Sequence, residues 1–518
     1  MIKPSFAVNL QKNNLSSFTL HLQYQCIRIM ASTRNSAFST IILIVTIFFI
    51  IGLSSCNDDR FSTNPKYTLD FSTDTLGFDT VFTKLGSATA KILVYNHNNV
   101  SLNISQISIS GGEKSAFHIN VDGSVSADNK FNNIEIRGND SLYIFVSVTV
   151  DPTDSNSPVF IEDSLEFLTN GVKQNIKLEA FGQNMEILNN KNILNDTTLT
   201  ADLPYIVYGN LVVDTAKTLT LNPGCKLYFH KNANLIVYGN LRAEGTAEKP
   251  ISLRGDRLDK IMFDTPIPYN YVAGQWGGVY LLWSGGSHTL KHVDINSGNV
   301  GIYFSNSDRN TLPNLDISDC RIYNFLYYGL VVQNGNVTVS NTEISNTGSY
   351  SVYLSGGKHN FIQSTIANYF SISNGQAISR DKKPAVMIMN LNRVAPMETV
   401  FQNCIICGSS ENEFSLATRF ADKYIGTFDH CYIRAAKTLD LPQFTNNRWY
   451  AKNDTVFKSI QYDYKLNTYF DFTPDSVSPA RGLADITIAK QFPLDLNGNN
   501  RLEDNEPDAG AYEWKPTK

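Results

Sequence analysis

A short triplet that always ends in isoleucine recurs six times in the second half of the chain and constrains the fold more than any other feature. The triplets are Val293-Asp294-Ile295, Cys320-Arg321-Ile322, Thr342-Glu343-Ile344, Ser364-Thr365-Ile366, Cys404-Ile405-Ile406 and Cys431-Tyr432-Ile433, and their isoleucines are 27, 22, 22, 40 and 27 residues apart. A three-residue strand cannot bury a face alone, so strands with this period must stack coil on coil. The repeat therefore predicts a solenoid, in which the 40-residue step holds an extra coil or an insertion.

Side-chain directions within the triplets follow from strand geometry, because successive residues point to opposite sides. The first residues are all small and should point into a narrow core. Cys404 is then a core thiol, although Cys404-x-x-Cys407 has the spacing of half a zinc or redox site. The middle residues Asp294, Arg321 and Glu343 alternate in charge, so we expect an outward salt ladder in which they satisfy one another.

A second strand in each coil carries the candidate binding residues. It aligns as Val279-Tyr280-Leu281, Ile302-Tyr303-Phe304, Leu330-Val331-Val332 and Val352-Tyr353-Leu354. The outward residues Tyr280, Tyr303 and Tyr353 would form a partly aromatic stripe across coils about 4.8 Å apart. Aromatic faces stack on the apolar faces of sugar rings, and a rigid row of them needs little ordering, so these tyrosines are candidate glycan-binding residues. The alternative is that they only cover one another or lie under a loop at residues 256–274.

Asparagines follow three of the isoleucines at the same spacing. Asn324, Asn346 and Asn368 are 22 residues apart, and asparagine tolerates left-handed corners and can hydrogen-bond along a stack. This ladder, with the coil length, resembles the right-handed parallel β-helix proteins. Further segments resemble the opening and closing parts of bacterial β-helix lipoproteins, and these segments are residues 221–227, 245–251, 275–279, 478–480 and 508–514. The resemblance implies a right-handed parallel β-helix over residues 190–515. Tyr208-Gly209-Asn210-Leu211, repeated at residues 238–241, is expected to belong to the same repeat.

The N-terminus carries an apolar run, residues 41–53, that is too short to span a membrane but suits a signal peptide. It leads into Leu53-Ser54-Ser55-Cys56, which resembles a bacterial lipobox. The resemblance implies a signal peptide at residues 1–55, with Met30 as an alternative start, and a lipidated linker at residues 56–65 whose acylated Cys56 enters the lipid bilayer. Asn57-Asp58-Asp59 resembles the surface-export signal of Bacteroidetes lipoproteins, which implies a lipid-anchored outer-membrane protein that faces the cell exterior.

Between the linker and the solenoid, residues 66–184 contain about seven short alternating strands, which predict an immunoglobulin-like β-sandwich. We therefore expect an all-β chain, a sandwich followed by the β-helix. The formal charge of −5, from 43 basic and 48 acidic residues, argues against a nucleic-acid partner.

No catalytic residue or metal ligand is identified, because the motifs of polygalacturonases, pectate lyases and alginate epimerases are absent from the β-helix region. Three charged segments are interpreted as solvated loops or turns: residues 254–264, 380–383 and 495–506. For residues 254–264 the alternative is a set of calcium ligands beside a base, and for residues 380–383 it is a site for an acidic sugar. For residues 495–506 it is a calcium loop that lacks its required glycine. We thus expect no cofactor, with calcium as the alternative. The expected function is a non-catalytic lipoprotein that presents the β-helix to polysaccharide or surface proteins; the alternative is a divergent polysaccharide lyase or glycoside hydrolase.

The lipobox generates a first prediction. Cys56→Ala should leave the protein unacylated and release it from membranes, because the lipid would be attached through the cysteine sulfur. Cell fractionation and the mass of the mature chain measure this, and Cys26→Ala, upstream of the lipobox, is the matched control. Retention of Cys56→Ala in the outer-membrane fraction would contradict the lipoprotein assignment.

Overall fold

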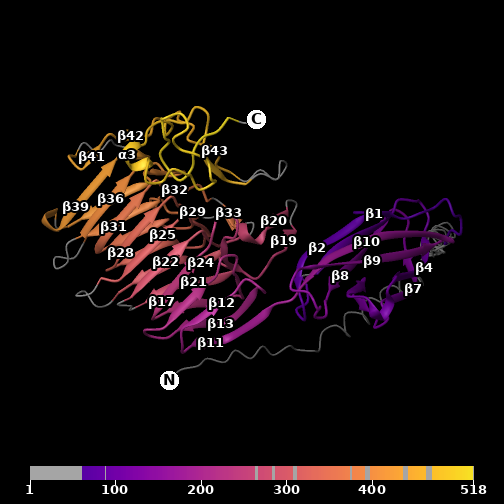
Figure 1. Ribbon diagram of the computed structural model, residues 1–518. Helices are drawn as coiled ribbons and strands as arrows, with labels where there is room; N and C mark the ends of the chain where they lie inside the picture. Colours follow the sequence, from indigo (N-terminus) through magenta and orange to yellow (C-terminus); the bar gives the residue numbers. More distant parts are fainter. Residues whose placement is uncertain are drawn as a thin grey trace, which may run out of the picture.

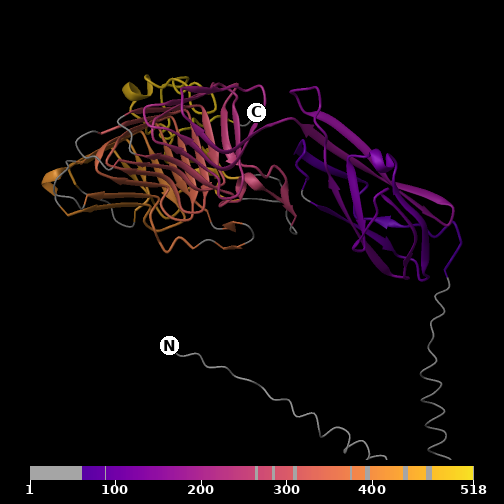
Figure 2. The ribbon, with the colours of Figure 1, turned by 90° about the horizontal axis from the view of Figure 1, so that it is seen from below.

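The computed structural model describes residues 61–516, except for 88, 263–265, 283–285, 307–311, 371, 374–375, 378, 391–396, 420, 436–440 and 462–468. The signal peptide and Cys56 lie outside the described residues. The described chain forms an N-terminal β-domain and a parallel β-helix, which Figures 1 and 2 show as two separate bodies. A small apolar cluster of Phe82, Ile206 and Tyr228 joins them, with the rings of Phe82 and Tyr228 5.3 Å apart.

Two five-stranded sheets pack around one apolar core in the N-terminal domain. The first sheet has the order β1 (Asp70–Phe71), β3 (Ala90–Asn96), β8 (Asp140–Val148), β5 (Phe117–Val121) and β6 (Ser124–Val125). The second has the order β2 (Thr75–Phe82), β10 (Val172–Gln183), β9 (Val159–Thr169), β4 (Leu102–Ile109) and β7 (Lys130–Ile136). The sequence predicts about seven strands, whereas the described residues of the domain form ten. Strands of two residues, such as β1 and β6, are too short to show an alternating pattern.

The β-helix has three faces of parallel strands, here named A, B and C in the order in which a coil visits them. Strand β11 (Glu186–Ile193) pairs with β13 (Tyr205–Val213), which bends from face C into face A. Face A continues with β16 (Asn234–Val237), β21 (Trp276–Leu282), β24 (Gly298–Ser305), β27 (Tyr328–Gln333), β30 (Val352–Ser355), β35 (Val386–Asn390) and β38 (Phe414–Thr418).

The other two faces follow the same progression, and Figure 1 shows strands of face B as one diagonal series from β17 to β39. Face B contains β12 (Thr197–Leu199), β14 (Thr218–Leu221), β17 (Asn240–Glu244), β22 (Ser287–Lys291), β25 (Asn314–Ser318), β28 (Asn336–Ser340), β31 (Gly357–Ile362), β36 (Met397–Gln402), β39 (Tyr424–Asp429) and β41 (Phe444–Thr445). Face C contains β15 (Lys226–Phe229), β18 (Ile251–Gly255), β23 (Val293–Asn296), β26 (Arg321–Phe325), β29 (Glu343–Thr347), β32 (Thr365–Asn368), β37 (Ile405–Gly408), β40 (Tyr432–Ile433) and β42 (Arg448–Trp449).

The predicted register of the triplets is confirmed on face C. Ile295 pairs with Ile322, and the pairing continues without a slip to Ile433. Each triplet's first residue is buried, which places the small row, including Cys404, in the core. The 40-residue step is an insertion rather than an extra coil, because β32 pairs directly with β37 and the step also holds the hairpin β33 (Ile372–Ser373) and β34 (Gln376–Ala377).

Two details of the predicted repeat are wrong. The copies of Tyr-Gly-Asn-Leu are not equivalent, because Leu211 pairs with Leu235 on face A whereas Leu241 pairs with Leu219 on face B. Among the predicted asparagines, Asn324 and Asn346 have the left-handed φ values of 61° and 51°. In the described part of the chain, however, no hydrogen bond joins the side chains of Asn324, Asn346 and Asn368 to one another. The side-chain nitrogen of Asn368 donates instead to the backbone oxygen of Thr347 at 2.9 Å.

A polar ladder does exist at the neighbouring corner, between faces B and C. The residue before each triplet has a positive φ between 45° and 55°, and these residues are His292, Asp319, Asn341, Gln363, Asn403 and His430. The Asn341 amide donates to Asp319 Oδ1 at 2.7 Å, and the Asn403 amide donates to Gln363 Oε1 at 2.5 Å. Hydrogen bonds between coils therefore fix the corner that turns the chain into face C.

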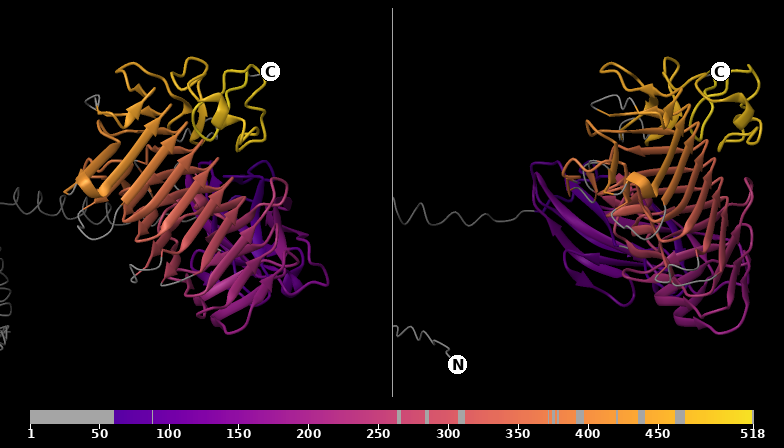
Figure 3. Two further views of the ribbon diagram at one scale, coloured as in Figure 1. Left: turned by 60° about the vertical axis from the view of Figure 1, so that its left-hand side comes forward. Right: turned by 90° about the vertical axis from the view of Figure 1, so that its left-hand side faces the viewer.

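The C-terminal segment, defined as residues 469–516, folds back against the outside of face C instead of adding coils; it is yellow in Figure 3. The corner ladder binds its backbone: the Gln363 amide donates to the carbonyl oxygens of Asp508 and Gly510 at 3.1 and 3.2 Å. Arg501, which is fully buried, donates to Asn341 Oδ1 at 2.7 Å. The segment contains β44 (Asp471–Pro474), which pairs with β43 (Phe457–Ser459), and the short helix α3 (Ile486–Ala489).

The docking of this segment generates a second prediction. Gly510 has φ +96°, and an added Cβ would lie 2.6 Å from Thr365 Oγ1 and 2.8 Å from Ile405 Cδ1. Gly510→Ala should therefore weaken docking by about 2–4 kcal/mol, from backbone strain and overpacking together. The control is Gly498→Ala, where φ is +81° but nothing lies within 4 Å, so only the backbone cost of about 1 kcal/mol applies. Thermal unfolding and limited proteolysis of the segment measure both; equal effects would contradict the packing role.

Candidate functional site

The predicted tyrosines form a continuous register on face A. Tyr280 pairs with Tyr303, Tyr303 with Val331, and Val331 with Tyr353. The three tyrosines, named here the tyrosine stripe, are half-buried, and the rings of Tyr280 and Tyr303 are 5.9 Å apart. Val331 is buried between them, so the stripe is interrupted at one coil.

Sequence analysis missed two aromatic neighbours of the stripe. Tyr328 stacks on Tyr350 at 6.1 Å, and Tyr350 lies 5.9 Å from Tyr353. Both precede their face A triplets by two residues and are 22 residues apart, so the repeat itself contained the signal. They widen the aromatic surface beside Tyr353, where Val331 leaves a gap.

Two hydroxyl groups of the stripe, those of Tyr303 and Tyr353, are bonded within the protein. Tyr303 donates to Gln333 Oε1 at 2.9 Å, and Ser305 donates to the same oxygen at 3.2 Å. Tyr353 donates to the Met389 sulfur at 3.2 Å. Burial raises the pKa of Tyr280 and of Tyr353, so both phenols stay neutral at physiological pH. The stripe can therefore present ring faces at fixed orientations but no charge.

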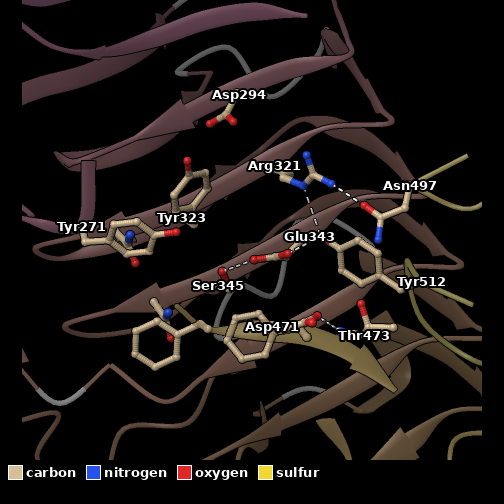
Figure 4. A pocket seen from close by; sticks show the side chains of 14 residues that line it. Tyr271, Asp294, Arg321, Tyr323, Glu343, Ser345, Asp471, Thr473, Asn497 and Tyr512 are labelled. Carbon is tan, nitrogen blue, oxygen red and sulfur yellow. Dashed lines mark hydrogen bonds between the residues drawn. The ribbon is translucent and has the colours of Figure 1, made fainter. Parts of the chain in front are cut away.

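A second feature is a pocket of about 310 Å³ between face C and the C-terminal segment, shown in Figure 4 and named here the face C pocket. Face C supplies Asp294, Arg321, Tyr323, Glu343 and Ser345, and the corner toward face A supplies Asn324 and Asn346. The C-terminal segment supplies the opposite wall through Phe470, Asp471, Phe472, Thr473, Asn497 and Tyr512, and Tyr271 closes one end. Sequence analysis did not predict this pocket, because the two walls are separated by more than a hundred residues.

The predicted salt ladder is wrong, as the contacts in the pocket show. Asp294, Arg321 and Glu343 are in register as expected. They do not satisfy one another, since the ion pairs of the described residues include none among these three. Coils stacked in register place charged side chains side by side, but the C-terminal segment supplies closer neutral partners to Arg321 and Glu343, and Asn296 of face C supplies one to Asp294.

The partners of the three charges are mostly neutral groups. Arg321 Nε donates to the Tyr512 hydroxyl at 3.2 Å, and its Nη2 donates to Asn497 Oδ1 at 2.8 Å. Glu343 accepts from the hydroxyls of Tyr512 and Ser345. Burial raises the pKa of Glu343 and of Asp294, although Arg321 lowers both in part. Carboxyl groups with raised pKa values in a pocket mark a candidate functional site.

The other predicted charged segments are engaged within the protein. Arg380 is buried and pairs with Glu413 at 2.6 Å, so it neither lies in a solvated loop nor faces a ligand. In the segment 254–264, Arg257 pairs with Asp259 at 2.5 Å, while Asp264 lies outside the described residues. The Asp495 carboxylate accepts N–H groups at both oxygens, from the backbone of Asn499 at 2.6 Å and of Glu513 at 2.7 Å.

The two cysteines of the Cys-x-x-Cys motif lie on opposite sides of face C. Cys404 belongs to the core of the β-helix, whereas Cys407 packs under the C-terminal segment, 3.1 Å from the Tyr369 hydroxyl. Their side chains therefore cannot share one metal ion. Within the described part of the chain, no group of three or more His, Cys, Asp or Glu residues is arranged to hold a metal.

The buried pair at Arg380 generates a third prediction. Arg380→Ala should destabilise the protein by about 3–5 kcal/mol, because it leaves the Glu413 carboxyl buried without its cation. Lys382→Ala, at an exposed neighbouring position, should change stability by less than about 0.5 kcal/mol. Thermal unfolding of both variants measures the difference, and an unchanged melting temperature in Arg380→Ala would show that the pair is not structural.

Solved structures that resemble the chain include a family 123 glycoside hydrolase from Clostridium perfringens, studied for glycolipid glycan hydrolysis, with 10% identity over 23% of this chain and 30% of that chain and a TM-score of 0.16. A PapD-like domain of human CEP192 matches with 11% identity over 25% of this chain and 95% of that domain, again at a TM-score of 0.16. The Vibrio cholerae VesB protease matches with 11% identity over 26% and 35%, also at 0.16. At such TM-scores these likenesses carry no argument.

The search of curated proteins gives no match. Among the described residues, no helix has the length and apolar character needed to cross a membrane. Residues 277–438, which span strands of all three faces, match the model of the family described as the right handed beta helix region, in agreement with the parallel faces of the structure.

Proposed function

We propose that the protein is a surface-exposed outer-membrane lipoprotein, anchored through acylated Cys56, whose β-helix binds glycan without catalysis. The lipobox-like residues 53–56 support the anchor, and the acidic residues after Cys56 support export to the surface. The observation that carries the binding function is the register of the tyrosine stripe on face A.

The stripe suits an extended carbohydrate for physical reasons. Successive coils stand about 4.8 Å apart, so its rings are spaced along a straight line on a rigid scaffold. An aromatic ring offers the apolar face of a sugar a large contact, and a scaffold that is already ordered loses little conformational entropy on binding. The neutral phenols neither attract nor repel charged polysaccharides, so the shape of the chain decides recognition.

The stripe generates a fourth prediction. Tyr303→Ala and Tyr353→Ala should each weaken glycan binding by about tenfold, the equivalent of one stacking contact of about 1.4 kcal/mol. A glycan array on residues 57–518 identifies the ligand, and titration of that ligand measures the loss. Tyr238→Ala removes an exposed tyrosine outside the stripe and should leave affinity unchanged. Lower melting temperatures without a binding defect would assign the stripe to packing alone.

A second candidate function is a divergent polysaccharide lyase or glycoside hydrolase, and the face C pocket is the observation that favours it. Asp294 and Glu343 have raised pKa values, which a general acid requires, and Arg321 and Tyr323 lie beside them. Activity on a polysaccharide panel, lost in Asp294→Asn and in Glu343→Gln, would establish this function in place of simple binding.

A further inference from the structure

The face C pocket contains polar groups that the protein does not fully use. One oxygen of Asp294, Oδ1, accepts from the Asn296 amide at 2.9 Å. Arg321 donates through Nε to the Tyr512 hydroxyl and through Nη2 to Asn497 Oδ1. The Asp294 carboxylate also accepts from the Tyr323 hydroxyl. A carboxylate has about four acceptor sites, so Asp294 keeps free acceptor capacity, and Arg321 keeps Nη1 as a donor on the adjacent coil. In Figure 4 both side chains lie around the same open space.

An unpaired buried atom also lies at the pocket wall. The Asn324 side chain is fully buried, and its nitrogen donates to the Asn270 carbonyl at 3.1 Å. Its oxygen, in contrast, has no hydrogen-bond partner among the described residues. Leaving a buried acceptor unpaired costs about 1–3 kcal/mol, so a ligand or water that donates to it would recover that cost.

Aromatic rings form another part of the lining. Tyr271 stacks on Tyr469 at 4.1 Å with one face, and lies 6.5 Å from Tyr323 at a tilt of 50°. Phe470 and Phe472 face them from the C-terminal segment. The pocket thus combines ring faces with paired donors and acceptors, which is the combination that a sugar residue needs for its apolar face and its hydroxyl groups.

Charge and size narrow the choice of ligand. Three carboxyl groups, Asp294, Glu343 and Asp471, line the pocket with a single guanidinium, so an anionic ligand would meet net repulsion wherever they ionise. The Arg321 guanidinium lies among these carboxyl groups and would repel a metal cation. A volume of about 310 Å³ is at the lower end for ligand pockets, which suits one ring rather than a chain.

We propose that the face C pocket binds a single neutral sugar residue, with Asp294 and Arg321 on its hydroxyl groups and the Tyr323 ring against its apolar face. The site lies on a different face from the tyrosine stripe, so the inference goes beyond the proposed function and stands without it. Because Asn497 and Tyr512 come from the C-terminal segment, the occupied pocket holds that segment on face C more tightly.

The direct test is saturation-transfer-difference NMR on residues 57–518 with glucose, galactose, mannose, xylose and N-acetylglucosamine, and with galacturonate as the anionic probe. At least one neutral sugar should bind with a dissociation constant of about 1 mM or weaker, since so few atoms limit the affinity. Galacturonate should bind more weakly. Asp294→Asn, which keeps the shape but removes the charge, should weaken binding by about tenfold, the loss of one charge-assisted hydrogen bond.

Two controls separate the pocket from the rest of the protein. Asp316→Asn changes an exposed carboxyl on face B and should leave the affinity unchanged. Tyr303→Ala should also leave it unchanged, because the stripe is a different site. A glycan array without a ligand would then refute the stripe and not the pocket.

The coupling to the C-terminal segment gives a readout that needs no variant. The bound sugar should slow amide hydrogen exchange at residues 494–513 of the unmodified protein, and not in the N-terminal domain. The proposal is overturned if no neutral sugar binds, if galacturonate binds best, if Asp294→Asn binds as the unmodified protein does, if Tyr303→Ala alone abolishes binding, or if the segment gains no protection.

Discussion

The fold depends on one constraint, that no coil of the chain can bury its inward side chains without the next coil in the same register. Each face has strands of a few residues, so a slip by a single residue would turn every inward side chain outward. The unbroken pairing from Ile295 to Ile433 shows that the register is held even across the 40-residue step that contains the insertion. The corner ladder explains how, because Asp319, Asn341, Gln363 and Asn403 bond between coils where the chain turns.

Constant register has a functional consequence, since any outward position becomes a straight row of side chains. On face A that row is left open and carries tyrosines. On face C the corresponding row begins with charges and continues with Thr365, Ile405 and Tyr432, which are all buried. The C-terminal segment covers this row: Ile405 and Tyr432 pack in its apolar cluster, and Thr365 accepts from the Ala511 backbone. The same segment extends over the charged residues at the other end of the row. There it leaves the face C pocket open, although the rest of the contact is packed.

Periodicity decided which features could be predicted from the sequence. The triplets, the core position of Cys404 and the register of Tyr280, Tyr303 and Tyr353 follow from a repeat that is visible in the printed chain. Tyr328 and Tyr350, and the corner residues Asp319, Asn341 and Gln363, obey the same 22-residue spacing and could have been found. The salt ladder was predicted incorrectly because Arg321 and Glu343 bond to the C-terminal segment, which lies outside the stack of coils. The face C pocket and the Arg380–Glu413 pair depend on contacts made by segments outside the repeat, and the local pattern contains no signal for those contacts.

The two candidate sites differ in what the scaffold contributes to them. The stripe needs only the coil spacing, so its geometry persists for as long as the coils are stacked. The pocket needs the C-terminal segment to stay docked, and that docking rests on hydrogen bonds from the corner ladder and on the buried residues Arg501 and Glu513. Burial raises the pKa of Glu513 to about 8, whereas its ordinary pKa is near 4.5. Between these two pH values the folded chain keeps a proton on Glu513 that the unfolded chain has released. The contribution of this group to stability is therefore most favourable at low pH and is lost as the pH rises from about 4.5 to 8. A ligand that requires the segment in place would consequently bind less well at pH 8 than at pH 4.5, whereas binding to the stripe would not follow that dependence.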